Sequence, residues 1–490
     1  ARPIVLLEKK KDFDYEVCKD SRYIGAFLPS SGIHRLLTDA VGPLIVTSAN
    51  ISDEPIITGD EEFKEKFLLP DKAIGMLWHN RKINIPQDDS VLAITKSESS
   101  ADKKYRVGFI RRSRGYAPLP VLIDSMSDGS SKAASVLAFG GDLKNTFAFG
   151  KKDRIIPSPY IGDLMDFDTL QNEKKLINAF SEMYSFKPDI LVCDLHPLYQ
   201  STTVATDMSK RQNLPLLQVQ HHHAHILSVM AENSLKKCIG VAFDGTGYGT
   251  DGKIWGGEIL YCSDSSFERK GHLQYVKLCG GDNAPKNAKQ VRECYEYALK
   301  GQAPALVKAA LDNNIGTFET SSVGRLYDAV ASLLDIKHEN SFEGECATLL
   351  EAKAWEYLTG TDNEDILPKL HIDIDFCNGQ YIINQIKLFN DIETLKTLGE
   401  YSEGAIAASF HLALADCICK VCDLIRQETN EENVALSGGV FNNRLLLGKT
   451  IDKLSKNGFK VYTNELVPTG DAGISLGQAY FALMKSASLN

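Results

Sequence analysis

The segment Ile239-Gly240-Val241-Ala242-Phe243-Asp244-Gly245-Thr246-Gly247-Tyr248-Gly249 says most about the architecture of this chain. Its apolar first half predicts a buried strand, and the Asp-Gly-Thr-Gly sequence after it predicts a tight turn, because glycine reaches backbone conformations that other residues avoid. Val136 to Phe139, followed by Gly140-Gly141-Asp142, predicts the same order of strand, glycine hairpin and strand. We therefore expect a duplicated α/β unit whose glycines, Gly140, Gly141 and Gly245 among them, bring backbone N–H groups close to an anion such as phosphate.

A third glycine turn follows the apolar run Val434 to Leu436 and precedes a predicted helix. It reads Ser437-Gly438-Gly439-Val440-Phe441-Asn442-Asn443-Arg444, and Gly438, Gly439 and Asn443 are expected to approach a nucleotide base or sugar. Gly324 and Asp328 lie in another motif, where Asp328 is expected to open an apolar helix and accept hydrogen bonds from a ribose. One glycine pair is typical of any turn, whereas three such turns, each after an apolar strand, favour nucleotide binding.

Four of the eleven histidines lie within five positions, in His221-His222-His223-Ala224-His225. On a helix, His221 and His225 lie one turn apart on one face, so their imidazoles can reach one metal ion. Asp244, where the apolar strand ends, is the best third ligand, and Asp471, in a glycine-flanked turn at a predicted helix start, is the fourth. The alternatives are a capping or solvated histidine cluster and, for Asp471, an ordinary helix N-cap. We predict that these four residues bind a divalent or iron-type metal and form the catalytic centre.

Residues 1–123 alternate short apolar runs with one or two helices. We expect strands at Ile4–Leu7, Ile24–Leu28 and Leu44–Ser48 and a helix at Gly32–Ala40. The last of these strands runs into Thr47-Ser48-Ala49-Asn50-Ile51-Ser52, where Ser48 and Asn50 offer donors for phosphate or carboxylate oxygens. An ordinary turn is the alternative, because serine and asparagine are also common turn formers.

Two charged motifs follow, the acidic pair Asp88-Asp89 and the basic cluster Arg111-Arg112-Ser113-Arg114. They contribute to a site only if they face a common cleft; otherwise they form a solvated surface. Two polar segments predict loops, Lys96–Lys104 and Asp124–Ala133, and the second is the best candidate for a linker between domains.

The length and charge of the chain limit its class. A chain of 490 residues is too long for one compact core, so we expect two or three domains, here 1–123 and 134–490 with the linker 124–133 between them. The net charge of −10 gives no basic field to attract a phosphate backbone, which argues against nucleic acid as the main partner.

The cysteines indicate a reducing compartment, because eleven of them scattered through a long chain read as free thiols of a cytoplasmic protein. Cys419 and Cys422 form a CxxC pair within the apolar segment Ala405–Arg426, which we expect to be a core helix. Because His411, Asp416 and Lys420 interrupt this segment, we expect no membrane span and no membrane partner.

Taken in order, these motifs resemble the HypF family, the carbamoyltransferases of nickel–iron hydrogenase maturation. Over residues 134–490 the resemblance rests on the His221/His225 pair, Asp-Gly-Thr-Gly-Tyr-Gly, Ser-Ser-Val-Gly-Arg-Leu-Tyr-Asp-Ala-Val-Ala, Ser341-Phe342-Glu343-Gly344-Glu345, Ser-Gly-Gly-Val-Phe-Asn-Asn-Arg and Gly-Asp-Ala-Gly-Ile-Ser-Leu-Gly-Gln. Residues 1–123 resemble the later part of the family's YrdC-like domain through Thr47-Ser48-Ala49-Asn50, Asp88-Asp89-Ser90-Val91 and Arg112-Ser113-Arg114-Gly115-Tyr116-Ala117-Pro118. The implied fold is α/β, a partial YrdC-like domain followed by a duplicated actin/sugar-kinase/Hsp70-like (ASKHA) domain related to the threonylcarbamoyl transferases of tRNA modification.

The resemblance implies an ATP-dependent carbamoyltransferase. Such enzymes convert carbamoyl phosphate and ATP, with Mg, into carbamoyl adenylate in the YrdC-like domain. The C-terminal domain then passes the carbamoyl group to the C-terminal cysteine of the protein HypE, for synthesis of the cyanide ligand. The bound metal is then a Lewis acid and a template, and the attacking thiol comes from HypE, so this chain needs no nucleophile of its own. Two alternatives stay open: a metal-dependent nucleotide-binding scaffold without turnover, and threonylcarbamoyl-type transfer to tRNA.

Members of this family also contain segments that are not in this sequence: an acylphosphatase-like domain, zinc-finger-like motifs and the first part of the YrdC-like domain. Because the chain starts at Ala1 without Met, we expect it to be cut from a longer one, with zinc bound only in the absent part. We also expect that these 490 residues alone cannot make carbamoyl adenylate, because they lack the cations needed against phosphate charge, but can transfer a carbamoyl group supplied as the adenylate.

Overall fold

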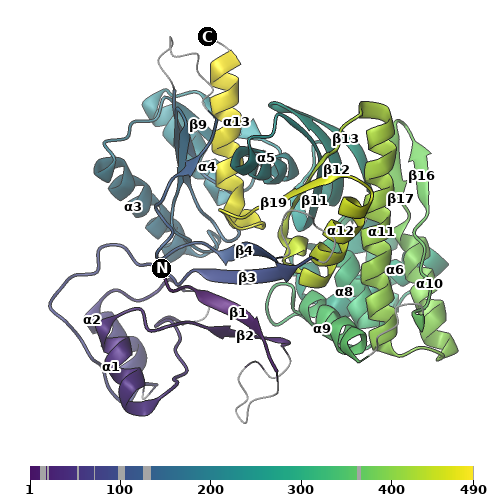
Figure 1. Cartoon of the computed structure of the whole chain (residues 1–490), viewed down its shortest axis with the longest axis horizontal. Coiled ribbons are helices and arrows are strands. Elements are labelled where there is room, and N and C mark those ends of the chain that lie inside the picture. The colour runs from purple at the N-terminus through teal and green to yellow at the C-terminus, as the bar shows by residue number, and fades with distance from the viewer. Residues whose placement is uncertain are drawn as a thin grey trace.

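The computed structural model describes residues 1–10, 18, 21–51, 54–70, 72–97, 105–124, 134–360 and 366–488. Within these ranges the strands form a four-stranded, a six-stranded and a nine-stranded sheet, with helices between and around them (Figure 1). The structure is therefore of the α/β class, as predicted.

The first sheet has the order β2-β1-β3-β4, with β1 parallel to β3 and the other neighbours antiparallel. Its strands are β1 Ile4–Glu8, β2 Tyr23–Ala26, β3 Val91–Lys96 and β4 Tyr105–Arg111; its helices are α1 Gly32–Val41 and α2 Asp60–Phe63, which continues as a π-helical turn, Lys64–Leu68. These bounds confirm the first two predicted strands and the predicted helix.

The strand predicted at Leu44–Ser48 is wrong, because these residues have no regular structure. Ile45 is 74% exposed, and an apolar run becomes a strand only where a neighbouring strand and a packed face are available. The apolar face of α1 is exposed as well, with Leu36 at 72%. The local sequence pattern was sufficient to predict α1, because a helix makes its backbone hydrogen bonds within itself. A strand needs a second strand for its backbone hydrogen bonds, and the local pattern does not specify that partner.

The second sheet has the order β10-β9-β6-β7-β8-β5. Its strands are β5 Val121–Leu122, β6 Ser135–Ala138, β7 Ala148–Lys151, β8 Arg154–Pro157, β9 Ile190–Asp194 and β10 Leu216–Val219. Alternate side chains of β6 enter different cores: Leu137 packs with α3 (Phe167–Met183) and α4 (Gln200–Gln212), and Val136 packs with α5 (His221–Asn233) and α13 (Ile474–Ser488). The sheet is therefore buried on both faces.

The third sheet has the path β16-β17-β13-β12-β11-β18-β19, with β15 beside β12 and β14 beside β15. Its strands are β11 Lys237–Tyr248, β12 Ile254–Ser263, β13 Ser266–Leu273, β14 Val276–Cys279, β15 Thr317–Thr320, β16 Ile374–Cys377, β17 Gln380–Ile383, β18 Asn433–Ser437 and β19 Lys460–Thr463. The surrounding helices are α6 Ala288–Lys300, α7 Ala305–Asp312, α8 Val323–Leu333, α9 Glu345–Thr359, α10 Gln385–Leu398, α11 Glu403–Thr429 and α12 Arg444–Lys456.

The two larger sheets share one topology, which confirms the predicted duplication. In each, an antiparallel glycine hairpin, β6–β7 or β11–β12, lies beside a parallel strand, β9 or β18. Helices α5 and α13 pack against each other and share one core with both sheets (Figure 1). The starts of these two helices therefore lie in the middle of the molecule.

One strand of the predicted first domain pairs with a strand of the second. β5 pairs with β8, so Val121 and Leu122 belong to the second sheet by hydrogen bonding. The predicted linker 124–133 lies outside the described residues from 125 on, as do Ser52 and most of the predicted loop Lys96–Lys104. The division stays a proposal.

The apolar segment that contains Cys419 and Cys422 is helix α11, as predicted, and both cysteines are buried. By length and composition α11 alone among the described helices is apolar enough to cross a membrane, but 83% of its most apolar window is buried inside the protein. This burial is typical of a core helix.

The N-terminal sheet docks onto the third sheet through β3 and β4, which reach toward α12 and β19 (Figure 1). Arg106 donates from Nη2 to the carbonyl of Val461 at 3.0 Å. Arg444, at the start of α12, makes contacts in the opposite direction. Its guanidinium stacks on the ring of Tyr23 in β2 at 3.6 Å and donates to the carbonyl of Leu6 in β1.

Candidate metal centre

The histidine-rich segment forms the first turns of α5. Gln220 caps this helix, because its side chain accepts a hydrogen bond from the backbone N–H of His223 at 2.8 Å. His221 and His225 are both fully buried and lie on one face, as the i, i+4 spacing predicts. The helix therefore presents two imidazoles to one point.

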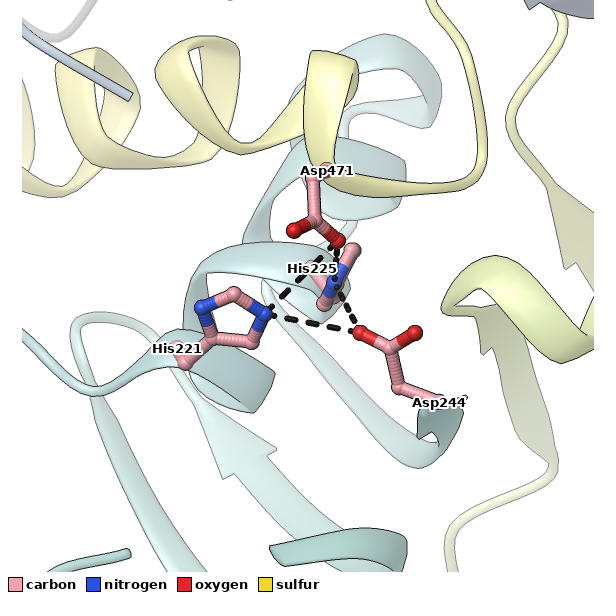
Figure 2. A group of neighbouring side chains, drawn as sticks. All are labelled: His221, His225, Asp244 and Asp471. Atoms are coloured by element: carbon pink, nitrogen blue, oxygen red, sulfur yellow. Dashed lines mark hydrogen bonds and ion pairs between the residues drawn. The ribbon is translucent and has the colours of Figure 1, made fainter. Parts of the chain in front are cut away.

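Two carboxylates from other elements reach the same point (Figure 2). Asp244 lies at an irregularity of β11, after the strand has paired with β12 through Phe243, and Asp471 opens the short helical turn before α13. Asp244 Oδ2 lies 3.1 Å from His225 Nε2 and 3.4 Å from His221 Nε2. Asp471 Oδ1 lies 3.6 Å from His225 Nε2 and 3.8 Å from His221 Nε2. The structure thus brings together all four residues that the sequence singled out.

Further hydrogen bonds fix the orientation of these side chains. His221 Nδ1 lies 2.8 Å from Asp194 Oδ2, and Asp194 is fully buried at the end of β9. Asp244 Oδ1 accepts from the backbone N–H groups of Gly245 at 2.8 Å and Gly439 at 3.2 Å. His221 Nε2 and Asp244 Oδ2 are therefore turned toward the centre of the cluster.

The carboxylates and imidazoles of the cluster shift one another's pKa values. Burial lowers the pKa of His221, but the Asp194, Asp244 and Asp471 carboxylates outweigh it and hold the pKa well above its usual range. Burial raises the pKa of Asp244, but His221 and His225 outweigh it and hold that pKa well below its usual range. The site therefore stabilises positive charge among its four side chains.

These residues fit a metal ion. The four donor atoms lie within 4.8 Å of one another, and donors held at about 2.1 Å from one ion lie roughly 3.0–3.4 Å apart. His221 Nε2 is buried without a hydrogen-bond partner, as expected for a ligand atom whose tautomer is set by a carboxylate on the other ring nitrogen.

His222 and His223, which lie between the two candidate ligands in the sequence, point into other surroundings. His222 Nδ1 lies 3.1 Å from Gln220 Nε2, and the His223 ring packs 4.7 Å from that of Phe267. Burial lowers the pKa of His223 to about 3 and that of His222 well below its usual range. Both are neutral packing residues.

A cavity of about 200 Å³ adjoins the cluster, and Asp244 and Asp471 line it. Five of the residues predicted to bind a cofactor also line it: Gly245, Gly324, Asp328, Gly439 and Asn443. Gly324 packs against Gly245, since a methyl group on its Cα would lie 2.8 Å from the Cα of Gly245. The second and third glycine turns therefore meet at one cavity.

Two of these residues differ in detail from the prediction. Asp328 lies in the middle of α8 rather than at its start, because the helix already begins at Val323. Its carboxylate accepts from Asn340 Nδ2 at 2.9 Å and lies 3.1 Å from Arg325 Nη2. The Asn443 side chain caps α12 through Leu446 N and lies 2.9 Å from His411 Nε2, so it meets the cavity with most of its hydrogen-bonding groups in use.

Three predicted glycines lie outside the lining of this cavity. Gly140 exchanges two backbone hydrogen bonds with the side chain of Gln478, and Gly438 donates its N–H to Thr469 O. Gly141 is closer, because a methyl group on its Cα would lie 4.0 Å from Asp471 Oδ2. The predicted anion therefore does not face the N–H of Gly140, which donates to Gln478. The N–H of Gly438, whose turn is predicted to approach a base or sugar, donates to Thr469.

Ser48 and Asn50 line a different cavity of about 220 Å³, together with Asp88, Arg111 and Tyr160. Ser48 Oγ donates to Asn50 Oδ1 at 2.6 Å. The charged motifs meet here as ion pairs, Asp88 with Arg111 at 2.8 Å and Asp89 with Arg114. Those predicted binding residues that line a cavity are therefore divided between two cavities, which border β4 through Arg111 and Ile110.

Three residues of the site were not singled out from the sequence: Asp194, Lys144 and Arg325. Asp194 is the last residue of β9, and Asp244 follows the apolar first half of β11; this shared position after an apolar run is the signal that could have identified Asp194. Lys144 and Arg325 lie inside motifs noted for their glycines, and both line the cavity. Only the packing of separate elements shows that they meet.

Family models match three parts of this chain. Residues 1–113 match the Sua5/YciO/YrdC model, described as telomere recombination. Residues 131–232 match the HypF Kae1-like domain, and residues 240–478 match the second subdomain of the carbamoyltransferase Kae1-like domain. The order and extent of these matches agree with the sheets described above.

Related proteins extend the comparison. The probable carbamoyltransferase HypF of Methanocaldococcus jannaschii is 31% identical over 99% of this chain and 62% of its own length. A carbamoyltransferase HypF homolog of Cupriavidus necator is 32% identical over 72% of this chain and 92% of its own length. The chain also spans 62% of the length of the Synechocystis carbamoyltransferase HypF, so it covers less than two thirds of these longer relatives.

Solved structures agree with the sequence comparison. The crystal structure of full-length HypF in the phosphate- and nucleotide-bound form is 37% identical, with a TM-score of 0.89 over 98% of this chain and 74% of that one. That of T. kodakarensis HypF is 33% identical, with a TM-score of 0.88 over 99% of this chain and 63% of that one. Since sequence, domain order and tertiary structure agree along nearly its whole length, this chain belongs to the HypF family of carbamoyltransferases.

Proposed function

We propose that this chain catalyses carbamoyl transfer from a carbamoyl adenylate, made from carbamoyl phosphate and ATP, to the C-terminal cysteine of a HypE protein. The observation that carries the proposal is the double role of Asp244 and Asp471. Both belong to the four-residue cluster and both line the adjoining cavity. A nucleotide bound in that cavity has its reacting end beside the cluster.

His221, His225, Asp244 and Asp471 are the proposed metal ligands. When bound, a divalent metal or iron supplies Lewis-acid stabilisation of charge on the adenylate oxygens. Asp194 orients His221, and the N–H groups of Gly245 and Gly439 orient Asp244. The chain's own contribution is this rigid arrangement, which needs little reorganisation during the reaction.

The cavity residues are proposed to hold the nucleotide. Asp328 is the proposed acceptor for a ribose hydroxyl, and the contacts by which Arg325 and Asn340 hold its carboxylate support this role. Gly324 and Gly439 contribute backbone to the lining, and a methyl group on either would meet the protein itself, Gly245 at 2.8 Å and Asp244 Oδ1 at 3.0 Å. Asn443 contributes mainly shape, since its amide is already engaged.

The transfer step is an attack by the thiolate of HypE on the carbamoyl carbon. A C–S bond forms and the C–O bond to the phosphate breaks, so AMP leaves and its phosphate oxygen takes the electron pair. Asp244, Asp471 and the two histidines are hydrogen-bond acceptors or metal ligands rather than nucleophiles, and the cysteines of this chain within the described ranges, apart from Cys18 and Cys377, are buried. The nucleophile is thus assigned to the partner.

Mass spectrometry of HypE tests this assignment. HypE is incubated with this chain and preformed carbamoyl adenylate, and we expect a thiocarbamate on its C-terminal cysteine. Asp244→Asn should abolish the product, whereas Asp335→Asn, at an exposed carboxylate far from the cluster in sequence, should not. Nucleotide binding without any transfer by the unsubstituted chain would instead identify a scaffold without turnover.

A further inference from the structure

Lys144 and Glu343 form an ion pair between the two halves of the ASKHA domain. Lys144 lies in the hairpin between β6 and β7, and Glu343 lies in the loop between α8 and α9. Their side chains are 43% and 57% exposed. Because both line the cavity that Asp244 and Asp471 also line, the pair spans an accessible part of this cavity.

The lining of the cavity is predominantly negative, so a cation such as Lys144 is needed to bind an anionic ligand there. Its charged lining consists of two cations, Lys144 and Arg325, and five carboxylates, those of Asp244, Asp328, Glu343, Glu351 and Asp471. A divalent ion at the cluster still leaves more negative than positive charge. An anionic phosphate can bind here stably only if a cation turns from a carboxylate of the protein toward the ligand.

Arg325 is poorly placed to change partner. Its side chain is 8% exposed and that of Asp328 is 2% exposed, and Asn340 also binds the Asp328 carboxylate. Separating two buried charges leaves one of them uncompensated in a medium of low polarity. Arg325 is therefore fixed where it holds Asp328.

Lys144 has a fixed backbone and a partly exposed side chain. Its N–H donates to Asp163 Oδ1 at 2.6 Å, and its φ of 48° places the backbone in the left-handed region. Burial lowers the pKa of Lys144, but Glu343, Asp471 and Asp244 outweigh it and raise the pKa. The ammonium group is thus already attracted by both metal-ligand carboxylates, and an exposed ion pair of this kind is weak.

We infer that the ammonium group of Lys144 binds a phosphate oxygen of the nucleotide. Before the nucleotide enters, Glu343 holds this ammonium group in the ion pair, away from the phosphate position. The inference rests on the proposed nucleotide site and adds to it the group that recognises the phosphate. It distinguishes nucleotides from nucleosides, because a ligand without phosphate offers Lys144 no new partner. The two members of the ion pair then have opposite effects on affinity.

Calorimetry with AMP and with adenosine, each in the presence of Mn²⁺, tests this inference. Lys144→Gln should weaken AMP binding about 10-fold, the typical effect of one charge-assisted hydrogen bond, and leave adenosine binding unchanged. Glu343→Gln should strengthen AMP binding about threefold, because Lys144 no longer has to leave a carboxylate. Lys144→Arg should restore most of the AMP affinity.

A matched control is the exposed pair Lys300 and Glu393, whose side chains are 46% and 22% exposed. Lys300→Gln and Glu393→Gln should leave both ligands unaffected. Loss of AMP affinity in both Lys144→Gln and Glu343→Gln would show a purely structural ion pair and overturn the inference, as would equal weakening of AMP and adenosine by Lys144→Gln. If the unsubstituted chain binds neither AMP nor adenosine, both the proposed nucleotide site and the inference are wrong. If the unsubstituted chain binds AMP and Lys144→Gln binds it equally well, the inference is wrong but the proposed nucleotide site is not.

Discussion

Asp194 acts on the candidate metal centre without touching the position of the ion. Its carboxylate lies 2.8 Å from His221 Nδ1 and is fully buried, so it fixes the ring with Nε2 toward Asp244 and Asp471. A carboxylate on the far nitrogen also makes a histidine a stronger ligand. The centre is thus built from five residues, four around the ion position and one behind it.

We predict that Asp194→Asn lowers metal affinity by about 10- to 100-fold while all four ligands remain. Competition with a chelator of known affinity, followed by elemental analysis, measures this change. Asp142→Asn is the matched control, because Asp142 is also a buried carboxylate, accepting from the N–H groups of Gln200 and Ser201. Equal affinity in Asp194→Asn and the unsubstituted chain would contradict the assigned role.

The ligands themselves give a simpler prediction. The doubly substituted chain His221→Ala/His225→Ala should contain no stoichiometric metal, whereas the unsubstituted chain should hold about one ion per polypeptide. Elemental analysis after gel filtration decides this. A substitution of the neutral packing residue His222 by Gln serves as the control, and unchanged metal content in the double variant would exclude the site.

Glu173 is a buried carboxyl group of α3 that lies outside the metal centre. It is fully buried, and neither of its oxygens has a hydrogen-bond partner within the described part of the chain. Burial, with a contribution from Asp142, raises its pKa to about 8. Glu173 is therefore protonated in the folded protein at neutral pH.

Because the folded-state pKa is the higher one, Glu173 favours folding below about pH 4.5 and this contribution is lost as pH rises toward 8. We predict that Glu173→Gln stabilises the protein at pH 8.5, by on the order of 4 kcal/mol relative to its effect at pH 4.5. Thermal midpoints measured across this pH range test it. Glu182→Gln, at an exposed position of the same helix, should show no such pH dependence; a parallel pair of curves for Glu173→Gln and the unsubstituted chain would refute the prediction.

Among the elements, the contact between α5 and α13 sets the geometry of the candidate metal centre. Gly477 of α13 lies against α5 so closely that a methyl group on its Cα would come 1.9 Å from the carbonyl oxygen of Ala224. Since His221 and His225 belong to α5 and Asp471 immediately precedes α13, this glycine determines how near the ligands can approach one another.

Gly477→Ala should therefore push the two helices apart. We expect a loss of stability of roughly 1–3 kcal/mol together with a weaker metal site, measured by thermal unfolding and by metal titration. Gly32→Ala is the control, because nothing lies within 4 Å of a methyl group there. Full metal affinity in Gly477→Ala would show that the ligand geometry does not depend on this helix contact.

On the scale of the whole molecule, Arg444 links the N-terminal sheet to the ASKHA domain. It stacks on Tyr23 and donates to the carbonyl of Leu6, and its backbone N–H donates to the buried carboxylate of Glu351, which lines the proposed nucleotide cavity. One residue thus contacts both β1 and β2 and a residue of the cavity wall.

We predict that Arg444→Ala loosens the N-terminal sheet, because it removes a cation–π contact of about 1 kcal/mol together with a hydrogen bond. Hydrogen exchange should become faster in β1 and β2 and remain slow in β6 and β9. Arg35→Ala, at an exposed ion pair with Asp39, should leave exchange unchanged. Unaltered exchange in β1 and β2 of Arg444→Ala would show that other contacts hold the sheet in place.

Local sequence was sufficient to predict the elements of the larger domain and to single out the cluster residues. Apolar strands followed by glycine turns, and two histidines one helical turn apart, are set by neighbours along the chain, so local pattern is enough to single out His221, His225, Asp244 and Asp471. Whether they bind a metal is still a prediction. The failure at Leu44–Ser48 has the complementary cause, because a strand depends on partners that local sequence does not specify.

Which polar groups meet depends on the packing of elements that are distant in the sequence. Asp194, Lys144 and Arg325 reach the site from separate elements, whereas Ser48 and Asn50 line another cavity and Gly140 and Gly438 turn their N–H groups to other partners. Those outcomes depend on the packing of α5 and α13 within one core with the two sheets, which is fixed by contacts between residues hundreds of positions apart. Periodicity and spacing describe a residue's near neighbours, and the convergence of distant residues follows only from how the whole chain packs.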